Sequence, residues 1–380
     1  MSTFRGFGIR RVLAAAVLSV TCGTLVLAQQ KPAPKDAKAD AAAQAAAQAQ
    51  QQEIQNLVRI ADAAMSGQQA PAEFPIQFQN DFLRAQGNRV WVPITLTIDP
   101  AKLTTSALTI YLRVVPRGMT APPAPAAAAA AAPTDKDKKD KDKDKKKDPK
   151  NATAAPPAPS YPFEDAQMFD AKPAPNQPLR ILRGIGVPAG NYDLYVVLHE
   201  RAAAGAAPGK TSVLKQPIDV PNYGNNEFAT STVILAERVD QLPAPITPDQ
   251  QSEHPYAFGQ TEIVVAPEHK FKKSQELIVL MQIYNPMLSP EKKFNLEATY
   301  TFYRQDAGTE KRFNATEPQV FTSDTMGAGF DPSAGNSSIQ AGQGVPLQSF
   351  PEGTYRLEIK VTDKLSAKVL TQNVNFTVTP

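Results

Sequence analysis

Two stretches of this chain, FPEGTYRLEIKVTD (Phe350–Asp363) and VPAGNYDLYVVLHE (Val187–Glu200), repeat one pattern. Each has Pro-x-Gly-x-Tyr-x-Leu, followed by apolar residues at every second position. Apolar residues with a period of two predict a β-strand with one buried face. Pro and Gly directly before the tyrosine predict a tight turn at the start of that strand. The repeat therefore predicts one turn-and-strand unit that the chain builds twice.

The similarity continues on both sides of these stretches. A closing strand with the pattern Val-Leu-x-Gln follows each of them, in SVLKQPIDV (Ser212–Val220) and KVLTQNVNFTV (Lys368–Val378). Upstream, VWVPITLTIDP (Val90–Pro100) corresponds to LIVLMQIYNP (Leu277–Pro286). The whole pattern predicts two tandem modules of the same design, spanning 72–222 and 257–380.

The segments between these stretches have the composition of strands. RVWVPITLTI (Arg89–Ile98) and ALTIYLRVVP (Ala107–Pro116) are rich in β-branched and aromatic residues, and Asp99-Pro100 separates them. No long helical pattern interrupts either module, which argues against parallel strands joined by helices. We therefore expect an all-β fold with two antiparallel β-sandwiches in tandem.

The two turn-and-strand stretches resemble the last strands of immunoglobulin-like and fibronectin-III-like domains, including those of secreted bacterial proteins. In such domains the tyrosine forms a corner, with its hydroxyl bonded to nearby backbone. The resemblance implies that Tyr192 and Tyr355 are the corner residues. Gly190 and Gly353 are expected to supply a turn conformation that is costly to other residues. The chain lacks the cysteine pair of antibody domains, and Trp91 is its only tryptophan.

The N-terminal region has the composition of an export signal. Three arginines precede the apolar run Val12–Ala28, which is too short to cross a bilayer comfortably. Residues 1–28 are therefore predicted to be a cleaved signal peptide, which implies a periplasmic or secreted protein without a transmembrane helix in the mature chain. The Ala/Gln-rich residues 29–52 are predicted to be a disordered tether. Apolar residues at helical spacing then predict a short amphipathic helix over 53–67.

Two further segments stand apart from the modules. Residues 117–159 contain Pro-Ala runs and a Lys/Asp tract with nine lysines and six aspartates, so we expect a disordered insertion in the first module. Residues 223–256 are predicted to be a linker, because the segment 241–255 is rich in proline. The apolar residues at 230–238 allow one extra strand within this linker.

Composition excludes several classes of protein. The formal net charge is +3, but the signal peptide and the Lys/Asp tract carry more positive charge than this, so the predicted modules are mildly acidic. A nucleic-acid partner is therefore not expected. Cys22, in the signal peptide, is the only cysteine, which excludes disulfides and cysteine-based metal sites from the mature chain.

The sequence contains no recognisable catalytic or metal-binding motif. The histidines His199, His254 and His269 lack the spacing of metal ligands, and no nucleophile elbow is present. Loop acids such as Asp306 and Asp324 have no distinctive spacing. We therefore expect a protein that is not an enzyme and has no cofactor and no metal.

These patterns favour an exported, non-catalytic interaction or structural protein of the cell envelope. Such a protein would bind an unknown protein or an envelope polymer through sandwich loops or strand edges. One alternative is a carbohydrate-binding protein, in which exposed Trp91 or Tyr303 would stack on sugar rings. A second alternative is a hydrolase with an unrecognised site.

Overall fold

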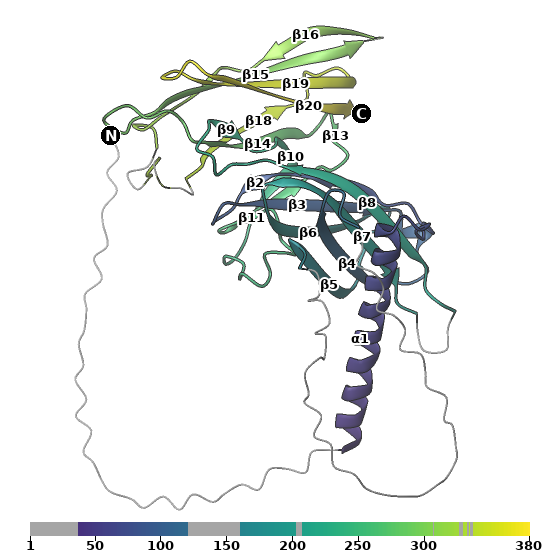
Figure 1. Cartoon of the computed structure of the whole chain (residues 1–380). Coiled ribbons are helices and arrows are strands. Elements are labelled where there is room, and N and C mark those ends of the chain that lie inside the picture. Colours follow the sequence, from purple (N-terminus) through teal and green to yellow (C-terminus); the bar gives the residue numbers. More distant parts are fainter. Residues whose placement is uncertain are drawn as a thin grey trace, which may run out of the picture. The chain divides into compact units, whose positions relative to one another are not determined.

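The computed structural model describes residues 37–120, 160–202, 207–306, 308–326, 330–332, 334 and 337–380 (Figure 1). The predicted signal peptide (1–28), the start of the predicted tether (29–36) and most of the predicted insertion (121–159) lie outside these residues. The described residues form β-strands β1 to β20, the α-helix α1 and a short 3-10 helix. The predicted all-β, β-sandwich fold class is therefore confirmed. Residues 52–380 form one compact unit, which contains all of these strands.

The first sandwich consists of two antiparallel sheets with an apolar core between them. In one sheet β3 pairs with β6 along one edge and with β1 and β2 along the other, and the second sheet has the order β5-β4-β7-β8. The bounds are β1 Gln77–Asn80, β2 Leu83–Arg84, β3 Arg89–Ile98, β4 Ala107–Pro116, β5 Phe163–Asp170, β6 Leu179–Pro188, β7 Gly190–Glu200 and β8 Thr211–Val220, with the 3-10 helix Pro100–Lys102 after β3. Val92, Ile94 and Val196 are completely buried in this core.

The second sandwich repeats this arrangement. One sheet has the order β11-β12-β10-β14-β18, with β9 also on β14, and the other has the order β13-β20-β19-β15-β16, with β17 also on β15. The bounds are β9 Ala229–Thr230, β10 Ile234–Gln241, β11 Ala257–Phe258, β12 Thr261–Val265, β13 Lys270–Lys272, β14 Glu276–Tyr284, β15 Asn295–Asp306, β16 Thr309–Ala315, β17 Gln319–Thr322, β18 Ile339–Pro346, β19 Gly353–Asp363 and β20 Val369–Thr379.

The strand order explains why the sequence repeats. β14 pairs with β18 as β3 pairs with β6, and the order β15-β19-β20 matches β4-β7-β8. The two quoted stretches supply β7 and β19, which lie between two partners in their sheets. The apolar residues of β19 face the core, whereas those of β7 are buried on both faces of its sheet. Each copy therefore carries the pattern for one sandwich.

The segment 223–256, predicted to be a linker with one possible extra strand, contains two strands of the second sandwich. β9 and β10 lie within it, and both pair with β14 of the second sandwich. Ile234, Leu235 and Ala236 are buried, so apolar burial draws this segment into the sheet. The second sandwich therefore begins before the predicted boundary at 257.

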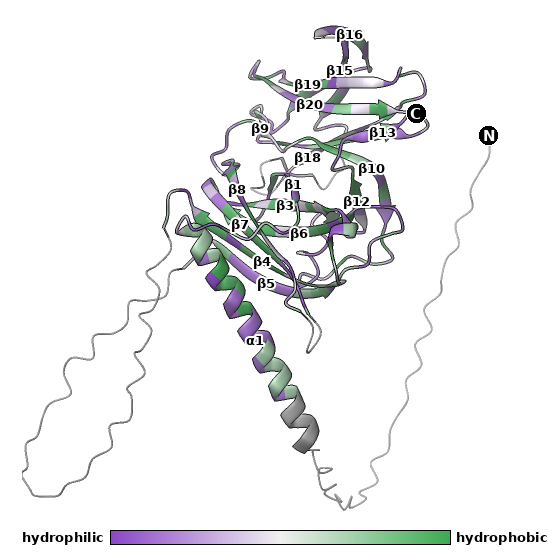
Figure 2. Cartoon of the chain, turned by 90° about the vertical axis from the view of Figure 1, so that its right-hand side faces the viewer, coloured by the Kyte–Doolittle hydropathy of each residue, from purple (hydrophilic) through white to green (hydrophobic). Residues whose placement is uncertain are grey.

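Helix α1 is longer than the sequence predicted. It spans Ala37–Met65, whereas residues 29–52 were expected to be disordered and only 53–67 to be helical. Alanine has the highest intrinsic helix propensity and glutamine is also favourable, so the Ala/Gln-rich segment 37–52 continues the helix, although the side chains of residues 43–52 are all exposed. Figure 2 shows hydrophilic and hydrophobic residues alternating along α1.

The last turns of α1 pack on the outer face of the β5-β4-β7-β8 sheet. Leu57 and Ala61 are fully buried there against Tyr111 and Val197. Below the helix, Arg113 is 2% exposed and forms ion pairs with carboxylates of the helix and of β5. The positions in the second sandwich that correspond to Tyr111 and Val197 hold Thr299 and Lys360. No helix of the described residues covers them. The two copies therefore differ mainly in whether this outer face is apolar or polar.

The two sandwiches contact each other through the outer faces of the sheets that contain β3 and β14. Buried Leu83, Ile234, Tyr256 and Val265 form a cluster with the partly buried Trp91. This apolar contact explains why the proline-rich segment before β11 lies against the first sandwich instead of extending as a spacer.

Asp81 forms the polar centre of this contact. Its carboxylate accepts hydrogen bonds from Tyr256 Oη at 2.6 Å and from Thr232 Oγ1 at 2.9 Å. Burial raises the pKa of Asp81 above its ordinary value of 3.8, although the two hydrogen bonds act in the opposite direction. A raised pKa means that Asp81 contributes most to stability at low pH, and that this contribution is lost as the pH rises through the pKa of the folded state.

We expect Asp81→Asn to become more stable relative to the wild type as the pH rises from about 4 to about 8, since asparagine keeps an acceptor without a buried charge. Urea unfolding at several pH values measures this difference. Asp170→Asn is the control, because Asp170 is a surface carboxylate, 69% exposed, in an ion pair. Parallel pH profiles for Asp81→Asn and the wild type would contradict the assignment.

Candidate functional site

The two predicted corner tyrosines lie at the starts of β7 and β19. Tyr355 is fully buried, and its hydroxyl donates a 2.6 Å hydrogen bond to the carbonyl oxygen of Pro351. Tyr192 is 7% exposed, and its hydroxyl lies 3.5 Å from the carbonyl oxygen of Ala189, which is long for a hydroxyl donor. The second sandwich therefore has the tighter corner.

The two turn glycines both have positive φ angles, +154° at Gly190 and +144° at Gly353. A side chain at Gly190 would also be crowded, since a Cβ there would lie 3.0 Å from the hydroxyl of Tyr192. At Gly353 the nearest atom to such a Cβ belongs to Arg304 at 3.7 Å, an ordinary contact. The backbone angle restricts both positions, and steric crowding restricts only the first.

Strands β7 and β19 each end on a buried carboxylate, which the sequence motifs did not reveal. Glu200 is the last residue of β7 and Asp363 is the last residue of β19, and both strands have 11 residues. Both side chains are completely buried. The two quoted stretches end on these acids, which is the only signal that the sequence offered.

Glu200 joins the two loops at its end of the first sandwich. Its carboxylate accepts hydrogen bonds from the backbone N–H groups of Thr104 and Thr105 in the β3–β4 loop and of Lys210 before β8. The distances from Thr105 and Lys210 are both 3.2 Å. Burial alone would raise the pKa of Glu200, but these bonds outweigh it and the pKa is lowered. Glu200 therefore remains a carboxylate in the folded protein at neutral pH.

Asp363 joins two loops of the second sandwich in the same way as Glu200 joins those of the first. Its Oδ2 accepts a 2.8 Å hydrogen bond from the N–H of Met287 in the β14–β15 loop. Its Oδ1 accepts bonds from the N–H groups of Leu365 at 3.0 Å and Ser366 at 3.4 Å, in the β19–β20 turn. We call each arrangement, a buried acid with the N–H groups of two loops, a carboxylate clasp. Bonds of this kind are charge-assisted and therefore stronger than neutral ones.

The clasp of Asp363 positions exposed apolar side chains. Met287, Leu365 and Val369 are 51%, 42% and 54% exposed, and they lie in or beside the two loops that Asp363 joins. We call these three residues the apolar loop end. The described residues of the clasped loops in the first sandwich contribute no large exposed apolar side chain.

Four lysines lie in the same two loops as the apolar loop end. Lys292 and Lys293 lie in the β14–β15 loop, and Lys364 and Lys368 lie in the β19–β20 turn. Lys293 pairs with Asp324 at 3.1 Å and Lys364 pairs with a glutamate of β15 at 2.9 Å. Among the described residues, Lys292 and Lys368 form no ion pair, while one exposed acid of the same loops, Glu291, accepts a hydrogen bond from Ser289 instead of a cation. The unpaired charges of the two loops therefore leave an excess of one positive charge.

The histidines have structural contacts. His199 lies 2.8 Å from the hydroxyl of Thr211, His254 pairs with Glu262, and His269 contacts Gln79 and a backbone carbonyl. Within the part of the chain that the structure describes, no three metal-ligating side chains gather at one place.

The other residues considered from the sequence also lie apart. The indole of Trp91 is in the contact between the sandwiches, where Nε1 donates to Pro255 O at 2.9 Å. The guanidinium of Arg356 lies 4.3 Å from the ring centre of Tyr303. Asp306 pairs with Arg304, and Asp324 pairs with the lysine named above. Asp306 and Asp324 therefore have separate basic partners.

Comparison with known proteins assigns no family to the chain. No family model and no curated protein matches the chain. Solved structures match weakly, among them a calcium-binding mutant of Bacteroides uniformis beta-glucuronidase 2, with a TM-score of 0.22 and 10% sequence identity. That match covers 80% of this chain and 32% of the other, so this chain spans about a third of its length. A likeness at this TM-score carries no conclusion about this chain.

The helix of the described residues is not apolar enough over its length to be a candidate membrane span.

Proposed function

We propose that this chain is an exported, non-catalytic binding protein of the cell envelope, with two immunoglobulin-like sandwiches in tandem. The second sandwich would bind a protein partner through the apolar loop end. One observation carries this proposal: the buried carboxylate of Asp363 holds two loops together so that Met287, Leu365 and Val369 face solvent from fixed backbone.

Fixed loops favour binding because less conformational entropy is lost when the partner docks. Large apolar side chains that gather on a surface are typical of interaction sites. In immunoglobulin-like sandwiches, loops gathered at one end of the sandwich are used for recognition. The strand order of both modules and the bonded corner of Tyr355 support the immunoglobulin-like description.

The proposed partner follows from the chemistry of this site. An apolar centre with lysines in the same loops is complementary to a protein surface that has an apolar hollow bordered by carboxylates. Export to the envelope rests on the basic and apolar N-terminal segment of the sequence.

No second function is proposed. Carbohydrate binding would need an accessible aromatic face, but Trp91 is partly buried in the contact between the sandwiches and the guanidinium of Arg356 lies over the ring of Tyr303. A hydrolase of the glycosidase type would need two neighbouring carboxylates, and the candidate acids Asp306 and Asp324 have separate basic partners.

The test compares crosslinked capture of partners from the native envelope by the full chain and by the double variant Met287→Ser/Leu365→Ser. We expect the double variant to lose at least about tenfold in affinity, since each side chain is about half exposed and full burial of such a side chain contributes about 1.5–3 kcal/mol. The matched control is Val239→Ser/Phe258→Ser, which changes two apolar side chains that are each 39% exposed elsewhere on the same sandwich.

Three outcomes would contradict the proposal. Equal loss of capture in both double variants would indicate general adhesiveness of apolar residues. Capture that disappears on deletion of residues 121–159 and survives the loop variant would place binding on that segment. Binding to vesicles of phosphatidylglycerol that the loop variant abolishes, without any crosslinked protein, would replace the protein partner by a lipid surface.

A further inference from the structure

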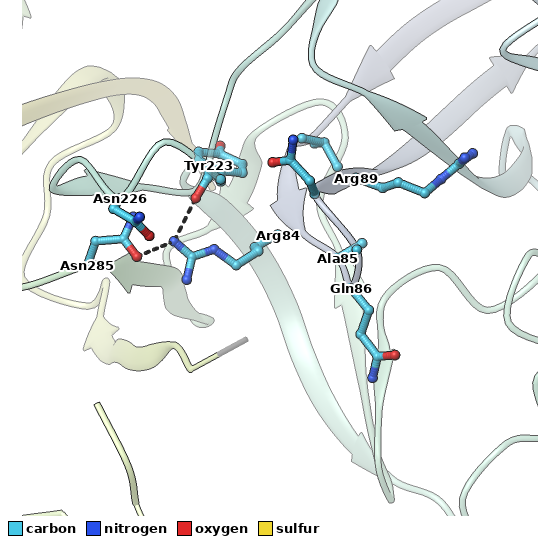
Figure 3. Close-up of a pocket in the computed structure, with 11 residues that line it drawn as sticks. Arg84, Ala85, Gln86, Arg89, Tyr223, Asn226 and Asn285 are labelled. Atoms are coloured by element: carbon cyan, nitrogen blue, oxygen red, sulfur yellow. Dashed lines mark hydrogen bonds between the residues drawn. The ribbon is translucent and has the colours of Figure 1, made fainter. Parts of the chain in front are cut away.

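A second candidate site lies where the two sandwiches meet, away from the apolar loop end. It is a cavity of about 430 Å³ between the β2–β3 hairpin, the segment after β8 and the end of β14 (Figure 3). Its polar lining residues are Arg84, Gln86, Asn88, Arg89, Tyr223, Asn226 and Asn285. The volume lies within the range of about 300–1,000 Å³ that is usual for small-molecule sites.

Arg84 is the central residue of this cavity, and it has only neutral partners. Its Nη2 donates to the carbonyl oxygen of Tyr223 at 2.9 Å and to Asn285 Oδ1 at 2.8 Å, as Figure 3 shows. Its Nη1 donates to the carbonyl oxygen of Ser337 at 3.2 Å, and the guanidinium lies 4.3 Å from the ring centre of Tyr284.

No carboxylate of the described residues therefore neutralises the positive charge of Arg84. Arg84 forms no ion pair within the described residues, and its buried Nε has no acceptor there. A guanidinium has five N–H donors, and these three hydrogen bonds use only three of them. Burial lowers the pKa of Arg84, as expected for a partly buried cation without an opposite charge. Partly buried charges are normally paired, so this one lacks an expected partner.

The rest of the lining favours an anion. The residues around the cavity include a second arginine and three asparagines, and none of them is a carboxylate. Asn226 and Asn285 come close to Arg84 in Figure 3, and both have left-handed backbone, with φ angles of 58° and 53°. A side-chain amide can donate hydrogen bonds to an anion, whereas an acid in its place would repel it.

We propose that this junction cavity binds a small organic carboxylate, with Arg84 as its counter-charge and Asn226 and Asn285 as neighbouring amide donors. Arg84 belongs to the first sandwich and contacts residues of the second, so the bound anion would also stabilise the junction. Neither statement depends on the protein partner proposed above.

The test variant is Asn226→Asp, which places a negative charge beside Arg84 in a residue that also tolerates left-handed backbone. The matched control is Asn176→Asp, at another exposed asparagine with a φ angle of 57°, in the loop before β6. Neither change removes Arg84, whose loss could disturb the junction itself.

Calorimetric titration of the full chain with citrate is the measurement, with inorganic phosphate and glycerol as comparison probes. We expect citrate to bind, Asn226→Asp to weaken citrate at least about tenfold, and Asn176→Asp to leave it unchanged, since a charge-assisted hydrogen bond contributes about 1.5–3 kcal/mol. Added salt should also weaken binding.

Several results would overturn the proposal. These are no heat of binding with citrate, equal weakening in both variants, tighter binding of phosphate than of citrate, or equal binding of glycerol. Failure here would leave the capture experiment on the apolar loop end unaffected, because the two sites share no residue.

Discussion

Replacing Asp363 by alanine is expected to lower the free energy of unfolding by about 2–4 kcal/mol, because three backbone N–H groups lose a buried, charged acceptor. Asp363 is fully buried, so water does not reach its place without movement of the loops. Urea unfolding followed by fluorescence measures the change. The control is Asp306→Ala, which removes a carboxylate that is 48% exposed from the same sandwich.

Two further measurements make this prediction specific. Hydrogen exchange should show faster exchange of the amides of Met287 and Leu365 in Asp363→Ala, because each of them donates to the missing carboxylate. Asp363→Asn should be intermediate, since one amide oxygen still accepts while the amide nitrogen faces a donor. Exchange rates equal to those of the wild type would show that the clasp does not hold these loops.

Replacing Leu57 by alanine is expected to destabilise the first sandwich by about 2–5 kcal/mol, the usual range for removing a large buried side chain. Leu57 is completely buried between α1 and the sheet, in contact with the cluster that contains Tyr111 and Val197. Because these two residues lie on an outer face, the helix is their only cover among the described residues.

Gln55→Ala is the matched control for this experiment, since Gln55 is an exposed residue two positions before Leu57 in the same helix. Alanine is also a better helix former than glutamine, so the control should be neutral or slightly stabilising. Thermal unfolding by calorimetry would show a lower unfolding temperature in Leu57→Ala and an unchanged or slightly higher one in Gln55→Ala. Equal transition temperatures in the two variants would mean that α1 contributes little to the first sandwich.

Local sequence patterns were sufficient for the central strands. Arg89–Ile98 and Ala107–Pro116 have the predicted ends, because β-branched residues fill each run and Asp99-Pro100 interrupts them. The repeated Pro-x-Gly-x-Tyr pattern indicated the duplication because turn chemistry and strand period occur together within a few residues.

Other elements could not be predicted in this way. The first part of α1 has no apolar periodicity, so only the intrinsic propensity of alanine and glutamine marks it as helical. The extra strand allowed at 230–238 overlaps β10, but the end of β10 was not predicted, because a register shift between Ala236 and Arg238 breaks the period of two along that strand.

The carboxylate clasps were missed because they depend on contacts far apart in sequence. Glu200 is separated from Thr104 by 96 residues, and Asp363 is separated from Met287 by 76. An acid at the end of an apolar strand is also an ordinary feature of a strand that meets solvent. Only the superposition of the two quoted stretches, each ending on an acid, distinguished these two residues from the other acids in the chain.

The clasps also make the second sandwich a suitable framework for grafting new loops. Asp363 holds its neighbours through backbone N–H groups, so the side chains at Met287 and Leu365 take no part in the bonds that fix them. Residues at these positions can be exchanged, as in a randomised library, while the anchoring hydrogen bonds persist. A chain without cysteine in its described residues would then display the new surfaces without any need for oxidative folding.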